Sequence, residues 1–381
     1  MEMNSGYKQT ETGTIPDDWT VMPVAEAFEI CNQLRFPISQ KIRSTMIGPY
    51  PYYGPTSVQG YINEYRVEGE YVLIGEDGDH FLKWRDMSMT MLVRGKFNVN
   101  NHAHLIKGTE NLTSWFYHFF SHRELDSYLT RQGAGRYKLT KKALARIPCA
   151  LPPIHEQRTI ATALSDVDVL LASLDELLAK KRDIKQATMQ QLLTGKQRLP
   201  GFSGDWAIKR LGDLAHIKTG SRNNEDKRED GEYPFYVRSE FVERIDTYSY
   251  DCEAILVPGE GRIGSIFHYI QGRFDVHQRV YAITQFKPQI SGRFIYYYLS
   301  KNFGAWAMQN TVKATVDSLR LPTFQTFEMR VPPTLGEQVA IVSVLSDMDV
   351  EITALEQKRE KTRALKQGMM QELLTGRIRL V

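Results

Sequence analysis

The feature that most constrains the fold of this chain is a long internal repeat. Residues 156–199 and 337–380 are two versions of one segment at a constant offset of 181, and 21 of the 44 aligned positions are identical. The alignment needs no gap. Because a repeat of this length does not arise by chance, the chain is expected to fold as two related halves.

Each copy of the repeat is typical of one long helix. In the first copy, apolar residues recur in alternating steps of four and three, as a coiled-coil seam requires, and the second copy has apolar residues at the matching positions. Pro152-Pro153 and Pro332-Pro333 precede the two starts, and Gly195 and Gly376 mark the two ends. The residues predicted to form the helix-pair interface are Ile160, Leu164, Val167, Leu171, Leu174, Leu178, Ile341, Leu345, Met348, Ile352 and Leu355.

About 40 residues at ~1.5 Å each predict a rod of roughly 60 Å for each copy. Its narrow apolar stripe has nothing local to cover it, so the other copy is the expected partner. Ahead of each rod, short β-type runs such as Tyr71–Ile74 and Ala254–Val257 are separated by glycines and followed by aromatic helical segments from Trp115 and from Phe294. Strands first and a helix later is the order of an α+β domain.

The predicted architecture is therefore α+β, with two globular domains, each a twisted β-sheet plus helices, separated by two long helices. These helices form an antiparallel coiled coil, and the whole has a pseudo-twofold internal repeat. Asp18-Trp19 and Asp205-Trp206 open the two globular segments and extend the duplication to them. The expected boundaries are residues 1–150 for the first domain, 151–197 for the central helix, 198–331 for the second domain and 332–381 for the distal helix.

Composition excludes several classes of protein. Hydrophobic residues make up 42% of the chain, which is ordinary for a globular protein. No stretch approaches the ~20 apolar residues of a membrane span, and the polar N-terminus is unlike a signal peptide, so a cytoplasmic protein is expected. Three distant cysteines indicate neither a disulfide framework nor a zinc site.

No motif predicts catalysis by this chain. Gly259, Gly261 and Gly264 have the spacing of a dinucleotide fingerprint, but that motif requires a following helix, whereas Ser265–Ile270 is strand-like. The context favours a glycine-rich β-turn over a cofactor site. His102 and His104 have no acidic or cysteine companion at ligand spacing. We therefore expect no catalytic residue, no metal site and no cofactor.

The distribution of charge is more informative than the net charge of +3. Residues 127–155 and 276–316 contain several cations and no acidic residue, and the two stretches occupy overlapping places in the two halves. Phosphate contact requires cations without competing carboxylates, so nucleic-acid binding is favoured over a solvated face in each domain. The predicted DNA-binding residues are Arg131, Arg136, Tyr137, Lys138, Lys141, Arg238, Arg262, Arg279, Lys313 and Arg320. Arg262, between Gly261 and Gly264, is the bolder prediction of a base contact.

This layout resembles the specificity subunit of type I restriction–modification systems. The resemblance rests on Leu151-Pro-Pro-Ile-His-Glu-Gln157, on its second version Val331-Pro-Pro-Thr-Leu-Gly-Glu-Gln338, on the two Leu-Leu-Thr-Gly endings and on Gly13-Thr-Ile-Pro-Asp-Asp-Trp19. The second version has one additional residue, Gly336, before its Glu-Gln pair. The match spans the chain, as two target-recognition domains with a central and a distal conserved helix.

The resemblance implies a non-catalytic reader of double-stranded DNA in which each globular domain recognises one half of a bipartite site. It also implies that the helix pair sets the spacer and docks two methyltransferase subunits, and that motor–nuclease subunits join the complex to give adenine methylation and cleavage. Two alternatives are a coiled-coil scaffold without DNA readout and a nucleotide enzyme that uses Gly259–Gly264.

Overall fold

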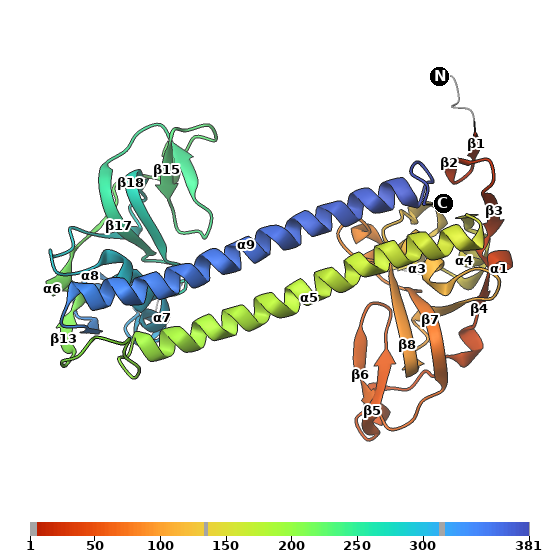
Figure 1. Cartoon of the computed structure of the whole chain (residues 1–381), viewed down its shortest axis with the longest axis horizontal. Helices are drawn as coiled ribbons and strands as arrows, with labels where there is room; N and C mark the ends of the chain where they lie inside the picture. Colours follow the sequence, from red (N-terminus) through yellow and green to blue (C-terminus); the bar gives the residue numbers. More distant parts are fainter. Residues whose placement is uncertain (1–5, 133–135, 312–316, 381) are drawn as a thin grey trace. The chain divides into compact units, whose positions relative to one another are not determined.

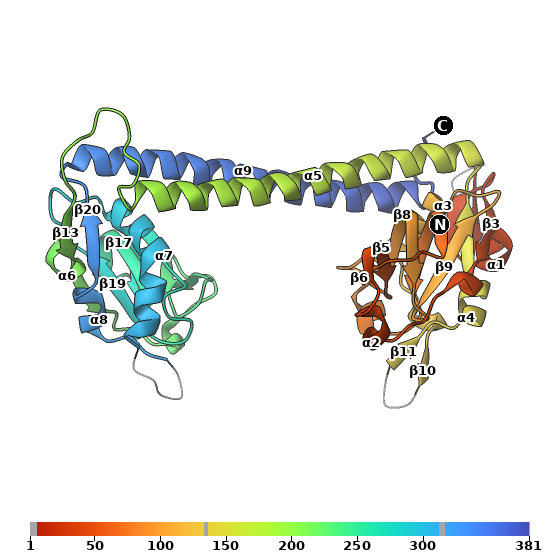
Figure 2. The same cartoon turned by 90° about the horizontal axis from the view of Figure 1, so that it is seen from below.

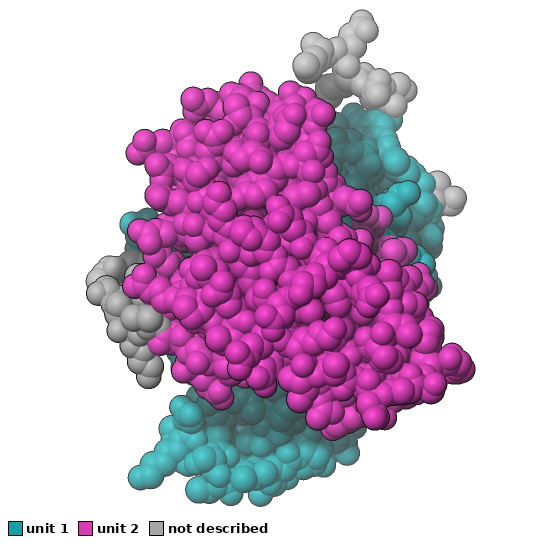
Figure 3. Space-filling model, turned by 90° about the vertical axis from the view of Figure 1, so that its left-hand side faces the viewer, with its two compact units in different colours: residues 1–174, 358–381 teal, residues 175–357 magenta. Residues whose placement is uncertain are grey.

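The computed structural model describes residues 6–132, 136–311 and 317–380, and the chain divides into two units (Figure 1). The first unit comprises Met1–Leu174 and Lys358–Val381, and the second comprises Asp175–Gln357 (Figure 3). Each unit therefore contains one globular domain, part of the first long helix and part of the second.

Both copies of the repeat form single helices, α5 (Ile154–Leu192) and α9 (Leu335–Leu373), each of 39 residues. The predicted pair of long helices is thus confirmed. The helices begin at equivalent positions, each two residues before its Glu-Gln pair, so the additional residue of the second copy lengthens the connection between Pro333 and the start of α9. Gly195 and Gly376 follow the last turns with φ angles of +70° and +69°, a left-handed conformation that favours glycine at a helix C-terminus.

Ion pairs join α5 and α9 in an antiparallel arrangement. In the second unit Lys181 contacts Glu351 at 2.6 Å and Lys185 contacts Asp349, so residue numbers rise along one helix as they fall along the other. In the first unit the equivalent pair, Lys366 and Asp168, is separated by 2.5 Å. Of the predicted interface residues, Val167, Leu171, Met348 and Leu355 are half-buried and the other seven are buried.

The globular domain of the first unit is built on a six-stranded sheet of order β4-β9-β7-β8-β5-β6, in which only the β5–β8 pair is parallel. The strands of the whole domain are β1 (Tyr7–Thr10), β2 (Gly13–Pro16), β3 (Thr20–Pro23), β4 (Phe28–Ile30), β5 (Ile47–Tyr53), β6 (Val58–Ile62), β7 (Val67–Gly75), β8 (Thr90–Val99), β9 (Ala103–Gly108), β10 (Thr130–Gln132), β11 (Arg136–Lys138) and β12 (Pro148–Leu151). Its helices and 3-10 turns are α1 (Val24–Ala27), η1 (Asn32–Leu34), α2 (Gln40–Arg43), η2 (Asp79–Lys83), α3 (Thr113–Ser121), η3 (Asp126–Tyr128) and α4 (Lys141–Arg146).

The globular domain of the second unit has the same topology, with sheet order β14-β19-β17-β18-β15-β16 and one parallel pair, β15–β18. Its strands are β13 (Ala207–Arg210), β14 (His216–Thr219), β15 (Tyr233–Tyr236), β16 (Glu243–Ile245), β17 (Tyr250–Pro258), β18 (His268–Val276), β19 (Val280–Thr284) and β20 (Glu328–Val331). Its helices are α6 (Leu211–Leu214), η4 (Asn224–Asp226), α7 (Gly292–Gln309) and α8 (Leu321–Gln325).

One predicted strand begins later than expected. The sequence pattern placed strand structure from Ser265, but β18 begins at His268, and residues 261–265 form a turn. Gly261 and Gly264 have φ angles of +84° and +68° there, which bend the chain before the strand can start. The prediction that no helix follows the glycine motif is confirmed.

Consecutive aromatic residues in a helix must point in several directions, which predicts core packing over an exposed stacking surface, and both aromatic helices do pack into the cores. Trp115, Phe116 and Phe120 of α3 are fully buried against alternate residues of β7, of which Val72 and Ile74 face the helix. Leu73 of the same strand belongs to a second cluster, as the period of two along a strand requires. In the second unit, Phe294 and Leu299 of α7 and the alternating residues of β17 repeat this arrangement.

A buried glutamate at the start of each long helix joins distant parts of the chain. Glu156 is fully buried and accepts hydrogen bonds from Trp19 Nε1 at 3.0 Å and from Arg379 Nε and Nη2 at 2.6 and 2.8 Å. Arg379 lies in the tail after α9 and also contacts Asp18 at 2.8 Å, which lowers the pKa of the Asp18 carboxyl. The tail of one long helix thus closes the start of the other.

The second unit contains the same arrangement of a buried glutamate, a tryptophan and a tail arginine, which we call the arginine lock. Glu337 of α9 is buried and contacts Arg198 of the tail after α5, with 2.7 Å between Oε2 and Nη2, and Trp206 Nε1 at 3.4 Å. The following glutamines have a separate role. Gln157 Oε1 accepts from the backbone of Leu112, the N-cap residue of α3, at 3.0 Å, and Gln338 Oε1 accepts from Ser291, the N-cap residue of α7, at 2.9 Å. The repeated Glu-Gln pair therefore fixes each long helix to its domain.

Within the described part of the chain, no helix combines the length and the hydropathy that a membrane span requires.

We expect Arg379→Ala and Arg198→Ala each to lower the free energy of unfolding. Each substitution leaves a buried glutamate without its cation, and breaking a buried ion pair costs on the order of 3 kcal/mol. Urea unfolding of the variants is the measurement. Arg377→Ala is the matched control, because this exposed arginine of the same tail should change stability by less than about 0.5 kcal/mol. Equal urea midpoints for Arg379→Ala and the control would contradict the proposed lock.

Candidate nucleic-acid interface

The two domains place a charged loop at the same position, directly after their long central strands. After β7, Gly78 N donates to Tyr137 O at 3.0 Å and Leu139 N donates to Glu76 O at 2.8 Å. The φ angle of Gly78 is +133°, a conformation open to glycine. These bonds attach the loop to β11, which lies at the end of the first domain away from α5 (Figure 2).

The loop after β17 makes the equivalent pairing. Gly261 N donates to Asp317 O at 3.3 Å, and Leu319 N donates to Gly259 O at 2.7 Å. Isolated β-bridges, Asp77 with Lys138 and Glu260 with Ser318, mark the same register in both domains. The loops can therefore be compared residue by residue: Asp77 corresponds to Glu260.

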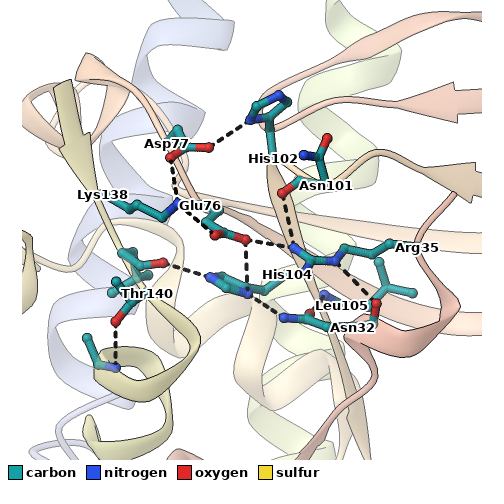
Figure 4. A network of polar contacts seen from close by, with 12 residues as sticks. Asn32, Arg35, Glu76, Asp77, Asn101, His102, His104, Leu105, Lys138 and Thr140 are labelled. Atoms are coloured by element: carbon teal, nitrogen blue, oxygen red, sulfur yellow. Dashed lines mark hydrogen bonds and ion pairs between the residues drawn. The ribbon is translucent and has the colours of Figure 1, made fainter. Parts of the chain in front are cut away.

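In the first domain this loop holds a network of charges (Figure 4). Lys138 Nζ lies 3.2 Å from Glu76 Oε1 and 3.6 Å from Asp77 Oδ1, and these contacts raise the pKa of Lys138. Glu76 also binds Arg35 at 2.7 Å, and Asp77 contacts His102 Nδ1 at 2.7 Å. Two carboxylates thus compensate two permanent cations and one histidine.

His104 lies beneath this network and is fully buried. Its Nε2 is 2.8 Å from the carbonyl of Leu139 and its Nδ1 is 2.9 Å from Asn32 Nδ2, so a neutral ring with the proton on Nε2 satisfies both contacts. Burial lowers the pKa of His104, which favours this neutral form. His104 is a structural support of the loop, and among the described residues no cluster of His, Cys, Asp and Glu could hold a metal ion.

In the second domain one carboxylate faces two guanidinium groups. Glu260 lies 3.0 Å from Arg279 Nη1 and 3.3 Å from Arg238 Nη1. His277 is buried next to them, and burial, followed by the charges of Arg238 and Arg279, lowers its pKa. Unlike the first network, this cluster keeps an excess of positive charge.

A polar pocket of about 110 Å³ adjoins this cluster. Glu260, Gln278, Arg279 and Arg320 are among its lining residues, and Gly259 forms part of its wall. A side chain at Gly259 would meet the Tyr281 ring at 2.8 Å, so the glycine permits the close approach of backbone and ring. The pocket concentrates hydrogen-bonding groups beside the guanidinium groups.

The other predicted DNA-binding residues lie around these loops or on neighbouring turns. Arg131 of β10 stacks on the ring of Tyr137 at 4.9 Å and donates to its hydroxyl at 2.6 Å. Arg136 and Lys141 are exposed on β11 and at the start of α4. Arg262 is exposed and pairs with Glu240 at 2.7 Å. Lys313 lies outside the described residues.

The expectation of cations without competing carboxylates is wrong for two of these residues, Lys138 and Arg279. Lys138 and Arg279 belong to stretches without acidic residues, yet the fold brings Glu76, Asp77 and Glu260 to them from the ends of other strands. Arg238 and Arg262 are also ion-paired. The carboxylates were missed, although a signal was present: Tyr71-Val-Leu-Ile-Gly-Glu-Asp-Gly78 and Ala254-Ile-Leu-Val-Pro-Gly-Glu-Gly261 both place an acid and a glycine after an apolar strand.

Two domains of one topology, each with a charged loop at its free end, define a binding protein with two related recognition surfaces. The sequence profile of the type I restriction modification DNA specificity domain matches residues 16–181 and again residues 203–363. The chain therefore belongs to this family.

Relatives and solved structures agree with the family assignment. The chain is 27% identical to the Haemophilus influenzae protein S.HindORF215P, assigned as a type I restriction enzyme specificity subunit, over 86% of each chain. It is 22% identical to the MjaVIII specificity subunit of Methanocaldococcus jannaschii, over 98% of this chain and 96% of the relative. The fold is similar to that of the S subunit from M. genitalium, with a TM-score of 0.72, 14% identity and 98% coverage of both chains.

We expect Arg136→Ala to weaken DNA binding by the assembled complex and to reduce the salt slope by about one, as for one lost phosphate contact. Lys138 is already paired with Glu76 and Asp77, so Lys138→Ala should change the salt slope less and should mainly lower the free energy of unfolding. Titrations of DNA at several salt concentrations test this, with Lys8→Ala on β1 as the control. If Arg136→Ala changes neither the DNA affinity nor its salt slope, β11 is a solvated surface that does not contact DNA.

Proposed function

We propose that this chain is the DNA-recognition subunit of a type I restriction–modification complex, and that each of its domains reads one half of a bipartite DNA site. The observation that carries the proposal is the charged loop that occurs once in each domain, after equivalent strands, β7 and β17, of two sheets with the same topology. Membership of the specificity family supports it. The alternative of a coiled-coil scaffold is not supported, because the family match covers both domains.

Exposed apolar residues on the long helices favour docking of two methyltransferase subunits. Val169 and Val350, which are equivalent in the repeat, are 68% and 69% exposed. Ile184 and Leu365 form a second such pair, and Ile154 and Leu335 a third, all of them exposed. Apolar side chains that remain in water at equivalent positions suit two copies of one partner, each binding one version of the surface.

In this proposal the chain contributes recognition and geometry, while the methyltransferase subunits transfer methyl groups to adenine and motor–nuclease subunits cut DNA. One of the solved structures with the same fold concerns complex assembly and conformational transition of the type I R-M system, with a TM-score of 0.51, 14% identity and coverage of 96% of this chain and 99% of that one. The charged loops lie at the ends of the domains away from the long helices, so a subunit bound to the helices leaves the charged loops accessible.

The chain alone is expected to be inert and to form a complex of two methyltransferase subunits with one specificity subunit. Light scattering of the purified complex measures the stoichiometry, and a methylation assay of the isolated chain measures its activity. Val169→Asp and Val350→Asp should each reduce the complex to one methyltransferase subunit, since each disrupts one version of the surface. Methylation of DNA by the isolated chain would falsify the assigned role.

The long helices are expected to act as a ruler, so lengthening both should lengthen the non-specific spacer between the half-sites. An insertion of four residues is closest to a helical turn and shifts the apolar stripe by only ~40°. It adds ~6 Å to each helix, against a rise of ~3.4 Å per base pair, so the spacer should grow by one or two base pairs.

Each added base pair also turns the second half-site by roughly 34°, given about 10.5 pairs per turn, so some affinity should be lost to strain or to DNA bending. The half-sites should keep their sequences, because no reading residue moves within its domain. Sequencing of methylated bases in cells that express the double-insertion variant is the measurement. An active variant with the original spacer contradicts the ruler, and changed half-sites would mean that the helices take part in base reading.

A further inference from the structure

The carboxylate of Glu260 holds two arginines that come from different parts of the second domain. Arg279 lies in the turn that precedes β19, and Arg238 follows β15. Each guanidinium uses its Nη1 group for Glu260, at 3.0 and 3.3 Å. Because a guanidinium has five N–H donors, most of each donor set remains available, and both side chains are about half exposed, at 56% and 44%.

The same arrangement recurs in the first domain with other side chains. Asp77, at the position of Glu260, contacts His102 and Lys138. The turns that carry the partners are also equivalent: His102 N donates to Asn100 Oδ1 at 2.8 Å, as Arg279 N donates to His277 Nδ1 at 3.0 Å. Both domains thus have an acidic side chain at this position that contacts cationic side chains, while the cationic residues differ between the two domains. This difference indicates a role in sequence selectivity.

A carboxylate within a cationic cluster weakens contact with phosphates, because it repels them. It suits a base-reading arginine, since the carboxylate orients the planar guanidinium and leaves the opposite edge free. That edge matches the O6 and N7 acceptors of guanine in the major groove. The cluster is therefore better suited to base edges than to the DNA backbone.

We propose that Glu260 is a positioning residue that presents Arg238 and Arg279 to guanine edges in the half-site read by the second domain. This inference rests on the proposed function and deepens it. Arg320 provides the contrast. It lines the same pocket, and among the described residues no ion pair involves it, so it fits a phosphate contact.

The test uses the complete complex with its methyltransferase subunits and maps methylated bases for the wild type, Glu260→Gln, Glu260→Asp, Arg279→Lys and Arg320→Ala. Glu260→Gln and Arg279→Lys should relax the requirement for guanine in one half-site, with discrimination reduced roughly 5- to 150-fold, the range for a lost bidentate contact. Non-specific affinity should not fall, because neither variant removes a positive charge. Glu260→Asp keeps a carboxylate, as Asp77 does in the first domain, and should restore discrimination in part.

Arg320→Ala should weaken binding to all sequences and lower the salt slope without changing the motif. The inference is overturned if Glu260→Gln and Arg279→Lys both keep the wild-type motif in a complex that still methylates a bipartite site. It is also overturned if they bind all DNA more tightly with unchanged discrimination, because the cluster would then contact phosphates. If the wild-type complex recognises no bipartite site, the proposed function itself fails, and this inference fails with it.

Discussion

The fold depends on one buried carboxylate at the start of each long helix. Glu156 and Glu337 are almost entirely removed from water, and an ionised carboxylate in that position is costly unless it is paired and hydrogen-bonded. Each therefore requires an indole N–H from the opening of its own domain and an arginine from the tail after the other long helix. The start of each long helix is thus held by the tail that follows the other.

This requirement separates a fixed frame from variable surfaces. The Glu-Gln pairs, the two tryptophans and the two tail arginines recur at equivalent positions, and they hold each aromatic helix and sheet against the long helices. Beyond the ends of β7 and β17 the residues differ: Asp77 holds a lysine and a histidine, whereas Glu260 holds two arginines. A common frame with different loops is what two unlike half-sites require.

The elements that the sequence predicts well are those with local signals. Apolar periodicity, the proline pairs and the terminal glycines define α5 and α9 because each signal acts within a few residues of its effect. The aromatic helices could be assigned to the cores since consecutive rings must point in several directions. The carboxylates beside Lys138 and Arg279 could not be predicted from the acid-free stretches, because tertiary structure supplies them from distant strand ends. The arginine locks were missed even though Arg198 and Arg379 stand at the repeat offset, since identity in a repeat does not show which residue is the partner.

The most direct measurement of the central claim is the sequencing of methylated bases in DNA from cells that express this chain with its cognate methyltransferase subunit. A chain with two recognition domains on one frame should give a single motif with two specific blocks and a non-specific spacer of fixed length. Replacing residues 207–331, which begin and end in the paired strands β13 and β20, with the corresponding domain of another family member should then change one block only. An uninterrupted motif, or a change in both blocks after the exchange, would contradict the account.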